Sequence, residues 1–541
     1  MTEIHNAFVA KVEHTLRELG ADIVAFDENF KAPGWDITLD CDGTLWPLRL
    51  KFFGCSVDEL PAIYWRRPVP VWGWPHVSSS GDVCVSDREG LEYDPNDLRG
   101  VIGWLLREAA RLLAETSAMS AKERLLAFAD ELEGYLRNNG SASVALDEKL
   151  DTTKSTYAEV SFTRKGKSGP VTPKVYRVNQ GTTQLPTCHQ ERLGILDVTI
   201  HQIDGLLSEW NDSWWETFLA KLSLDQRAVV TKAKNRGVIL RVPNRFGDSL
   251  VLLYWGLHPK KNRSTYLLQR QDHEYLVNRT GGAIEMRHVI IAGCGAVGAR
   301  VAEHLALTGI GKITLVDSDK FSPDNLGRHI LGRQSISKPK VSELAKLLAE
   351  RMPGIQIEAK AIHVQAMLAK GELAVADAIV LATGNSALER SIARKAFKES
   401  WTSLIVSASV EAAGLGGHAI AMRPGTPGCL DCLYIDPDTQ DPLPNMRTAL
   451  MAPDQKVTRQ LTGCGAFTPY SAIDATRTAI LAAERVLTNI PLYSRWAGEA
   501  VLAKAEGIQP SPTYDALRTR RVGADVEPVE LAQPGCPCCG A

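Results

Sequence analysis

The sequence predicts a multidomain α/β protein whose C-terminal part is a doubly wound parallel sheet. A chain of 541 residues is too long for one hydrophobic core, so we expect several domains. From His288 onward, short apolar strands alternate with helical segments, which is the pattern of a parallel sheet covered by helices. A glycine-rich loop, Gly-x-Gly-x-x-Gly, joins the first of these strands to the helix that follows it.

Residues 1–145 are predicted to form an α+β domain. An amphipathic helical pattern comes first, and short alternating segments typical of an antiparallel meander follow it. The turn-rich run from Asn138 to Ser143 indicates a boundary. The expected elements are a helix over 4–19, strands over 35–39, 45–53 and 62–66, a loop over 68–95 and a helical pattern from 97 to about 136.

Residues 146–275 are predicted to form a connecting domain, and the sequence assigns it no role. Strands are expected over 157–162, 238–242 and 250–255. Residues 276–541 form the third predicted domain. Its expected elements are strands over 289–292, 312–317, 378–382 and 403–407 and a helix over 299–307.

The charge balance excludes several classes of partner. Lys and Arg number 61 against 63 for Asp and Glu, so the net charge is −2. This balance gives no basic footprint for nucleic acid or for an anionic membrane. We see no apolar run near the roughly 20 residues that span a bilayer. The first residues do not have the pattern of a secretory signal, and eleven cysteines then indicate thiol chemistry or metal binding in the cytoplasm.

The glycine loop predicts a nucleotide site of the Rossmann type. Gly293, Gly295 and Gly298 permit a tight turn and a close approach of the backbone to phosphates at a helix N-terminus. Asp317 ends the second strand, where a carboxylate can bind ribose hydroxyls. The loop by itself is most typical of nicotinamide or flavin enzymes.

Two cysteine pairs predict a structural zinc site. Cys429 and Cys432 form the first pair, and Cys536 and Cys539 form the second near the end of the chain. Four thiolates close a tetrahedral Zn²⁺ site and leave no position open for a substrate. Cys538 is the ambiguous member of the second pair, and the two-residue gap favours Cys536 with Cys539.

The residues after the second strand distinguish between ATP and NAD as the nucleotide. The run Asp317-Ser-Asp319, then Asn325-Leu-Gly-Arg328, then Pro339-Lys340-Val341 resembles the ubiquitin-activating superfamily, which includes the sulfur-carrier adenylyltransferases of molybdopterin and thiamine synthesis (ThiF/MoeB type). The resemblance implies ATP rather than NAD. It places Asp317 on the ribose and Asn325, Arg328 and Lys340 on the triphosphate, with Asp319 and Asn385 also at the nucleotide.

The magnesium position departs from this family. The family has an Asp-Asn pair that supplies a Mg²⁺ ligand, whereas this chain has Gly384-Asn385. Mg²⁺ requires oxygen ligands, so another carboxylate is expected, with Asp319 and Glu411 as the candidates. Arg279, just before the first strand, is a candidate phosphate ligand.

The family resemblance also assigns an acceptor thiol. In the family a loop before a helix carries this cysteine, and Cys464 stands between two glycines at such a place. A helix N-terminus lowers the pKa of a thiol, so a nucleophile is expected, although lone cysteines are often structural.

The N-terminal domain carries a second resemblance. Trp74-Pro-His76, followed by Gly81-Asp-Val-Cys84, resembles the catalytic stretch of ubiquitin-conjugating enzymes. His76 and Cys84 match the family residues, whereas the family's oxyanion-stabilising Asn is replaced by Ser78.

The whole chain resembles the fused activating–conjugating enzymes of the bacterial anti-phage operons called CBASS. This resemblance implies ATP-dependent adenylation of a protein C-terminus, thioester transfer through Cys464 and then Cys84, and conjugation to an amine. It further implies a homodimer and a cGAS-like nucleotidyltransferase as the protein substrate. Two alternatives stay open: a sulfur-carrier adenylyltransferase, and an inactive scaffold that binds nucleotide.

Overall fold

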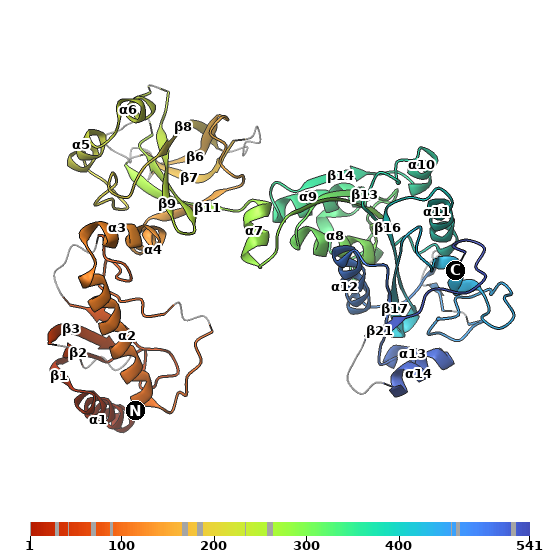
Figure 1. The fold of residues 1–541 in the computed structure, drawn as a ribbon, viewed down its shortest axis with the longest axis horizontal. Coiled ribbons are helices and arrows are strands. Elements are labelled where there is room, and N and C mark those ends of the chain that lie inside the picture. The colour runs from red at the N-terminus through yellow and green to blue at the C-terminus, as the bar shows by residue number, and fades with distance from the viewer. Residues whose placement is uncertain are drawn as a thin grey trace. The chain divides into compact units, whose positions relative to one another are not determined.

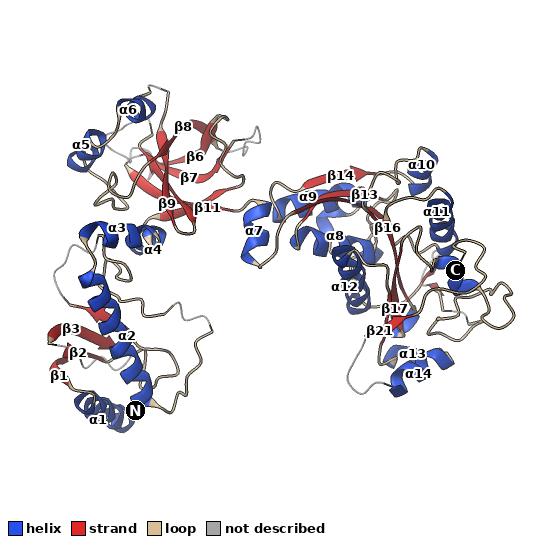
Figure 2. Cartoon of the chain, in the orientation of Figure 1, coloured by secondary structure: helices blue, strands red, loops and turns tan. Residues whose placement is uncertain are grey.

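The structure of the chain is a computed structural model, shown in Figures 1 and 2. It describes residues 2–27, 32–41, 43–66, 72–86, 90–164, 171–180, 188–232, 234–256, 263–455, 457–460, 466–520 and 526–540. The chain divides into two compact units, Met1–Arg270 and Gln271–Ala541, and each is described by itself.

The first unit begins with a helix and an antiparallel meander, in the predicted order. Within the described residues the sheet has the order β1-β2-β3-β4. Alternate side chains such as Trp35, Leu48 and Leu50 are fully buried and form the core against the helices. Strand β1 was not predicted from the sequence. The elements are α1 (Thr2–Glu18), β1 (Ala21–Asp27), β2 (Gly34–Cys41), β3 (Thr44–Lys51) and β4 (Ala62–Trp65).

The helical pattern predicted from 97 to about 136 is confirmed, and it consists of three helices. They are α2 (Leu98–Ala118), α3 (Ala121–Ala129) and α4 (Leu132–Asn138). Ser120 explains the first break, because its side chain accepts a hydrogen bond from the backbone N–H of Glu123 while the Glu123 side chain bonds back to Ser120. This capping box starts a new helix in a new direction, whereas the apolar periodicity continues across it.

The connecting segment folds into a closed barrel, which the sequence did not predict (Figure 2). The three strands expected there are confirmed as β6, β9 and β10. Residues of β5, which the prediction divided at the domain boundary, pair in parallel with β11 and β7 and help to close the barrel. The strands follow the order β10-β11-β5-β7-β6-β8-β9. The elements are β5 (Ala142–Leu146), β6 (Thr156–Arg164), β7 (Val171–Asn179), β8 (His189–Asp197), α5 (Asp212–Ala220), α6 (Leu224–Thr231), β9 (Gly237–Asn244), β10 (Gly247–Tyr254) and β11 (Ser264–Arg270).

The second unit is built on a mixed sheet with the order β14-β13-β12-β15-β16-β17-β20-β21. The predicted strands are confirmed as β12, β13, β15 and β16, which pair in parallel. Strand β14, which pairs in parallel with β13, was not predicted. The sheet is not parallel throughout, because β17, β20 and β21 continue it in antiparallel fashion. The strands are β12 (Glu285–Ala292), β13 (Ile310–Val316), β14 (Gln356–Lys360), β15 (Ala378–Leu381), β16 (Leu404–Val410), β17 (Gly416–Met422), β20 (Tyr493–Ala497) and β21 (Val526–Val529).

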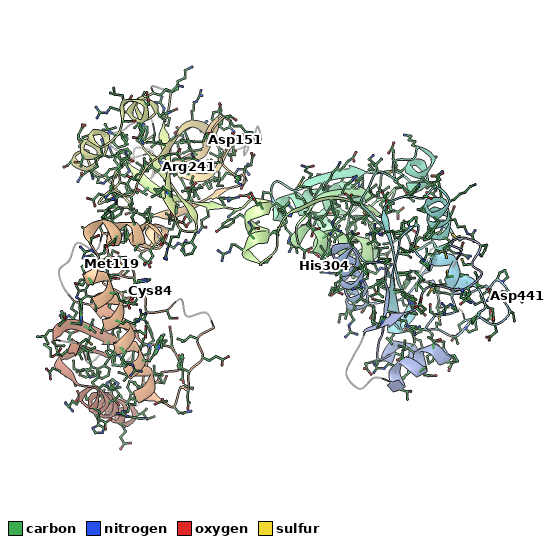
Figure 3. The ribbon with its side chains drawn as sticks, in the orientation of Figure 1. Cys84, Met119, Asp151, Arg241, His304 and Asp441 are labelled. Carbon is green, nitrogen blue, oxygen red and sulfur yellow. The ribbon has the colours of Figure 1, made fainter. Side chains whose placement is uncertain are left out.

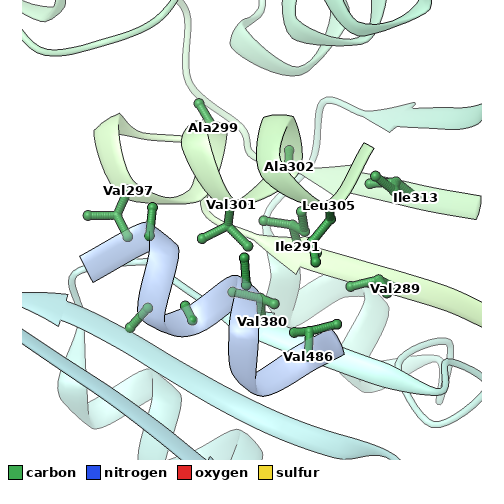
Figure 4. Packing of buried hydrophobic residues seen from close by; sticks show 14 of the residues in the cluster. Val289, Ile291, Val297, Ala299, Val301, Ala302, Leu305, Ile313, Val380 and Val486 are labelled. Atoms are coloured by element: carbon green, nitrogen blue, oxygen red, sulfur yellow. The ribbon is translucent and has the colours of Figure 1, made fainter. Parts of the chain in front are cut away.

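Helices cover this sheet and complete its core. In Figure 4, Val301 and Leu305 of α8 meet Ile291 of β12 and Val486 of α12, all of them buried. Two short strands, β18 (Arg459–Gln460) and β19 (Ala466–Phe467), pair separately. In the described ranges, we find no helix with the length and apolarity needed to cross a membrane. The helices are α7 (His273–Arg279), α8 (Ala296–Leu307), α9 (Lys340–Arg351), α10 (Val364–Ala369), α11 (Ser386–Lys398), α12 (Ala472–Thr488), α13 (Val501–Ala505) and α14 (Pro512–Arg520).

Candidate functional site

The predicted glycine loop leads from β12 into α8, and two of its glycines, Gly293 and Gly298, are needed for steric reasons. Gly293 has φ +88°, and a Cβ there would lie 2.4 Å from the carbonyl oxygen of Ala382. A Cβ on Gly298 would lie 1.9 Å from the carbonyl oxygen of Gly293. Gly295 is the N-cap of α8 and has open space at its Cβ position. The loop therefore presents bare backbone at a helix N-terminus, where phosphates bind.

A cavity of about 380 Å³ opens beside this loop, at the carboxyl ends of β12 and β15. Its lining includes Gly295 from the first loop and Gly384 and Asn385 from the second. The strand order reverses here, because β13 and β14 lie on one side of β12 while β15 and β16 lie on the other. Open α/β sheets bind ligands at such a point, and the volume lies in the range of small-molecule sites.

Glu389 lines the same cavity, and the sequence interpretation missed it. Its carboxyl group is buried and accepts hydrogen bonds from Thr383 N at 3.0 Å, Thr383 Oγ1 at 2.8 Å and Ser407 Oγ at 2.6 Å. Burial raises the pKa of Glu389 above its ordinary value. The residue lies four positions after Asn385 in α11, and this separation of one helical turn was the available signal.

Asp317, Asp319 and Lys340 lie together at the end of β13. Asp317 Oδ2 accepts a hydrogen bond from the backbone N–H of Cys294 at 2.8 Å, and its Oδ1 accepts one from the N–H of Asp319 at 2.8 Å. The ammonium of Lys340 lies 2.9 Å from Asp319 Oδ2 and is mostly buried. The predicted cluster is therefore assembled, and it ties the glycine loop to the start of α9.

The other predicted cation reaches the edge of the cavity. Arg328 donates to the carbonyl oxygen of Thr468 at 3.2 Å and stacks over the Tyr470 ring at 4.6 Å, and both partners line the cavity. The side-chain oxygen of Asn325 accepts a hydrogen bond from the N–H of Ser322 at 3.1 Å, in a short capped turn. Arg279 ends α7 with an exposed side chain and is not among the residues that line the cavity.

The magnesium candidates differ in their surroundings. The carboxylate of Glu411 accepts hydrogen bonds from His418 at 2.6 Å and from the N–H groups of Leu450 and Met451, and Glu411 is not among the residues that line the cavity. Asp319 keeps an exposed carboxylate beside Lys340. Glu389 is the acidic residue among the described residues that line the cavity. Mg²⁺ is commonly bound by one or two carboxylates together with substrate phosphates, and this donor set fits that need.

The four predicted zinc ligands come together. Their sulfur atoms all lie within 4.8 Å of one another, with Cys429–Cys432 at 3.9 Å, Cys429–Cys536 at 3.7 Å and Cys432–Cys539 at 3.4 Å. A tetrahedron with Zn–S bonds of about 2.3 Å has edges of about 3.8 Å, so the cluster fits Zn²⁺. The hydrogen bond from Cys429 lowers the pKa of Cys432 to about 5, which favours a thiolate there.

This cysteine cluster also supports the wall of the cavity. Asp431, between the two cysteines of the first pair, accepts hydrogen bonds from Arg390 at 2.7 Å and from Arg394, both on α11. Arg390 stacks over the Tyr434 ring at 4.0 Å. Arg390, Tyr434 and Leu430 all line the cavity, so the cysteine cluster and the cavity share a wall.

The N-terminal candidates form a second site. The backbone N–H of Cys84 donates to the carbonyl oxygen of His76 at 2.8 Å, and a bridge between Val77 and Val83 holds the two segments together. Both candidates line a cleft of about 840 Å³ along α2, and Figure 3 labels Cys84 there. Cys84 is exposed. Ser78, at the place of the family's Asn, bonds instead to Asp82 N at 3.1 Å.

His76 has an acidic partner that the sequence interpretation missed. Its Nδ1 lies 2.9 Å from Glu131 Oε1, and its backbone N–H donates to Glu131 Oε2 at 2.7 Å. This hydrogen bond raises the pKa of His76 above its ordinary value. Cys464 lies outside the described residues, so its predicted role stays a prediction.

Comparisons with known proteins agree with the nucleotide site. Residues 278–510 match the ThiF family. The sulfur carrier protein ThiS adenylyltransferase of Escherichia coli (strain K12) is 34% identical over 163 residues, which are 30% of this chain and 62% of that protein. The ATP-dependent ubiquitin transferase-like protein Cap2 of Pseudomonas aeruginosa (strain BWHPSA011 / Pa011) is 27% identical over 232 residues, which are 40% of this chain and 39% of that protein.

These matches cover part of each protein. The chain spans 62% and 39% of the length of these two curated relatives. A crystal structure of E. coli MccB with MccA-N7isoASN is 16% identical, and the match covers 49% of this chain and 70% of that one with a TM-score of 0.34. The matched residues 278–510 include the glycine loop and the cavity, and this part of the chain is therefore a ThiF-family domain.

Proposed function

We propose that this chain uses ATP to adenylate the C-terminal carboxylate of a protein and passes the acyl group through two thiols to an amine. The observation that carries the proposal is the pairing of two sites in one chain. The second unit has a nucleotide cavity at the strand-order reversal, and the first unit has a cleft with Cys84 beside His76. A sulfur-carrier adenylyltransferase has no use for the second site.

The nucleotide pocket supplies binding and charge neutralisation. The amides at Gly295 face the phosphates, Asp317 serves the ribose, and Lys340 and Arg328 meet negative charge on the triphosphate. Mg²⁺, held by Asp319 together with the phosphates, would add to this neutralisation. The substrate carboxylate oxygen attacks the α-phosphorus, a P–O bond forms, and pyrophosphate leaves with its electron pair.

Thioester chemistry then moves the acyl group. In the proposal the thiolate of Cys464 attacks the acyl carbon and AMP leaves, and the thiolate of Cys84 then displaces Cys464. An amine finally displaces Cys84 to give an amide. Each exchange between thiols needs an accessible thiolate but little driving force, and Cys84 is exposed. The substrate class that the resemblance favours is a cGAS-like nucleotidyltransferase activated through its C-terminal tail, with the enzyme as a homodimer.

The experiment measures ATP–pyrophosphate exchange and thioester formation with a candidate substrate protein. We expect exchange that depends on the intact C-terminal tail of the substrate. We also expect a thioester that reducing agent removes and an amide product that resists reducing agent. Exchange without any thioester at Cys84 would contradict conjugation.

The second candidate is a sulfur-carrier adenylyltransferase, and the 34% identity to the ThiS adenylyltransferase favours it. It predicts a C-terminal thiocarboxylate on a small carrier protein and no effect of Cys84→Ala. Mass spectrometry of the carrier after reaction separates a thiocarboxylate from an amide conjugate.

A further inference from the structure

The cleft around Cys84 holds a histidine whose imidazole and backbone are both bound by one carboxylate. Glu131 contacts it twice, through the backbone N–H of His76 at 2.7 Å and through Nδ1 at 2.9 Å. His76 has φ +61°, the left-handed region that a non-glycine residue rarely adopts, and its carbonyl oxygen accepts the N–H of Cys84 at 2.8 Å. A strained backbone held in place by surrounding hydrogen bonds is typical of functional sites.

The contact to Glu131 determines which nitrogen of His76 can act. When neutral His76 donates from Nδ1 to Glu131, Nε2 carries a lone pair and can accept a proton. A nucleophile, a base and an acid that orients the base form a recurring catalytic arrangement. Cys84, His76 and Glu131 all line the same cleft.

Glu131 is in turn held by the barrel. Its neighbour Asp130 accepts a hydrogen bond from the backbone N–H of Arg245 at 2.9 Å and a second from the Arg245 side chain. Arg245 lies in the turn between β9 and β10. The barrel, to which the sequence assigned no role, therefore fixes the junction between α3 and α4 that carries Glu131.

We propose that Glu131 is a positioning residue that orients His76 as the general base for attack of the acceptor amine on the thioester at Cys84. The inference rests on the proposed conjugation. The amine nitrogen forms a C–N bond to the acyl carbon, the C–S bond breaks, and the electron pair leaves on the Cys84 sulfur. His76 Nε2 takes the proton of the amine and passes it to the leaving thiolate, which restores both groups.

Charged groups from several elements surround His76 and shape its titration. Glu131 raises the pKa of His76 through its hydrogen bond, and Arg111 and Arg245 lower it through their positive charges. Glu115, Asp82 and Asp130 also line the cleft. Arg111 is itself bonded to Glu115 at 2.8 Å, and Asp130 to Arg245, which partly balances these charges.

The test separates the last step from adenylation. The full-length enzyme is charged on Cys84 by exchange with a short synthetic peptide thioester ending in glycine, with Cys84→Ala as the background control. Discharge is then followed against pH with trifluoroethylamine, a weakly basic amine whose own titration does not mask that of His76. Free lysine serves as the second acceptor.

We expect the wild-type rate to rise through the elevated pKa of His76. Glu131→Gln should lower the plateau at least tenfold and move the inflection to lower pH, because the carboxylate that raises the pKa is gone. Glu131→Asp should partly restore both, and His76→Gln should abolish the inflection.

A Glu131→Gln enzyme that charges normally and discharges with the wild-type rate and pH profile overturns the inference while leaving the proposed function intact. Absence of tail-dependent ATP–pyrophosphate exchange in the wild-type enzyme counts against the proposed function instead. A Glu131→Gln protein with a lowered melting temperature still tests the inference, because loss of structure alone does not move the inflection of the remaining activity.

Discussion

The carboxyl group of Glu389 accepts a hydrogen bond from the hydroxyl of Ser407 at 2.6 Å. It also accepts hydrogen bonds from Thr383, which follows β15, so one side chain in the first turn of α11 connects β16 to the loop after β15. Thr383 and Ser407 both line the cavity beside the glycine loop. A buried carboxyl group needs such partners, because an unpaired one would be strongly disfavoured.

Replacing Glu389 should affect stability in a pH-dependent way. Burial raises its pKa above 4.5, so between 4.5 and the folded value the folded state binds more protons than the unfolded state. Folding stability contributed by this group therefore falls as pH rises through that window. Glu389→Gln does not titrate, and its melting temperature relative to wild type should improve as pH rises.

The control for this experiment is Glu399→Gln at the end of the same helix. The hydrogen bond from Lys395 lowers the pKa of Glu399, so its effect should have the opposite sign. Glu389→Ala, which leaves three donors without their acceptor, should cost about 1–3 kcal/mol and weaken ATP binding. If the difference in melting temperature between Glu389→Gln and the wild type does not change with pH, the raised pKa of Glu389 is contradicted.

Lys340→Ala should abolish adenylate formation. Its ammonium is mostly buried beside Asp319, where it can meet triphosphate charge. ATP–pyrophosphate exchange with the substrate tail present measures the effect. Lys346→Ala, on the exposed face of the same helix, is the matched control and should retain exchange. Full ATP–pyrophosphate exchange in Lys340→Ala would contradict the assignment of Lys340 to the triphosphate.

The cysteine cluster should hold one zinc per chain, and zinc should couple to nucleotide affinity. Cys429→Ser with Cys432→Ser should remove the metal, because these residues supply two of the four sulfur atoms. ATP should then bind more weakly, since Leu430 and Tyr434 beside the cluster line the cavity. Elemental analysis and ATP titration measure the two effects. Cys538→Ser should change neither the zinc content nor the affinity for ATP. An equal loss of zinc in Cys538→Ser would make Cys538 a zinc ligand.

The two thiols should be charged in a fixed order. Cys84→Ala should leave a thioester on Cys464, whereas Cys464→Ala should empty both sites, because the adenylate forms in the unit that contains Cys464. Non-reducing gels with a labelled substrate protein show each intermediate. Normal charging of Cys84 in Cys464→Ala would mean that the acyl group passes directly from the adenylate.

Arg245→Ala should slow discharge of Cys84 without affecting adenylation. An ion pair with one exposed partner contributes up to about 1 kcal/mol, so the loss should not exceed about fivefold. Arg241→Ala, which breaks an ion pair with Asp197 within the barrel strands, is the control and should have no effect. An equal loss in both variants would indicate general destabilisation of the barrel.

Local spacing was enough to predict the residues of the glycine loop and of the cysteine cluster. The glycine loop, the strands β12, β13, β15 and β16 and the two cysteine pairs are short-range patterns, and the structure places them together. Their physical requirements act within a few residues: a turn without Cβ atoms, a helix N-terminus, or a two-residue gap between thiolates. The antiparallel strands β17, β20 and β21 were not predicted, because pairing direction depends on distant partners.

The sequence by itself determined which candidate site residues each unit carries, and the tertiary structure decided which other side chains contact them. The residues of the pairs Glu389–Ser407 and His76–Glu131 are 18 and 55 positions apart, and neither pair has a periodic signal. The barrel closes only when β5 pairs in parallel with β7 and β11, a contact between distant segments. Spacing rules describe neighbours along one helix or strand, whereas these contacts form only when the whole unit folds.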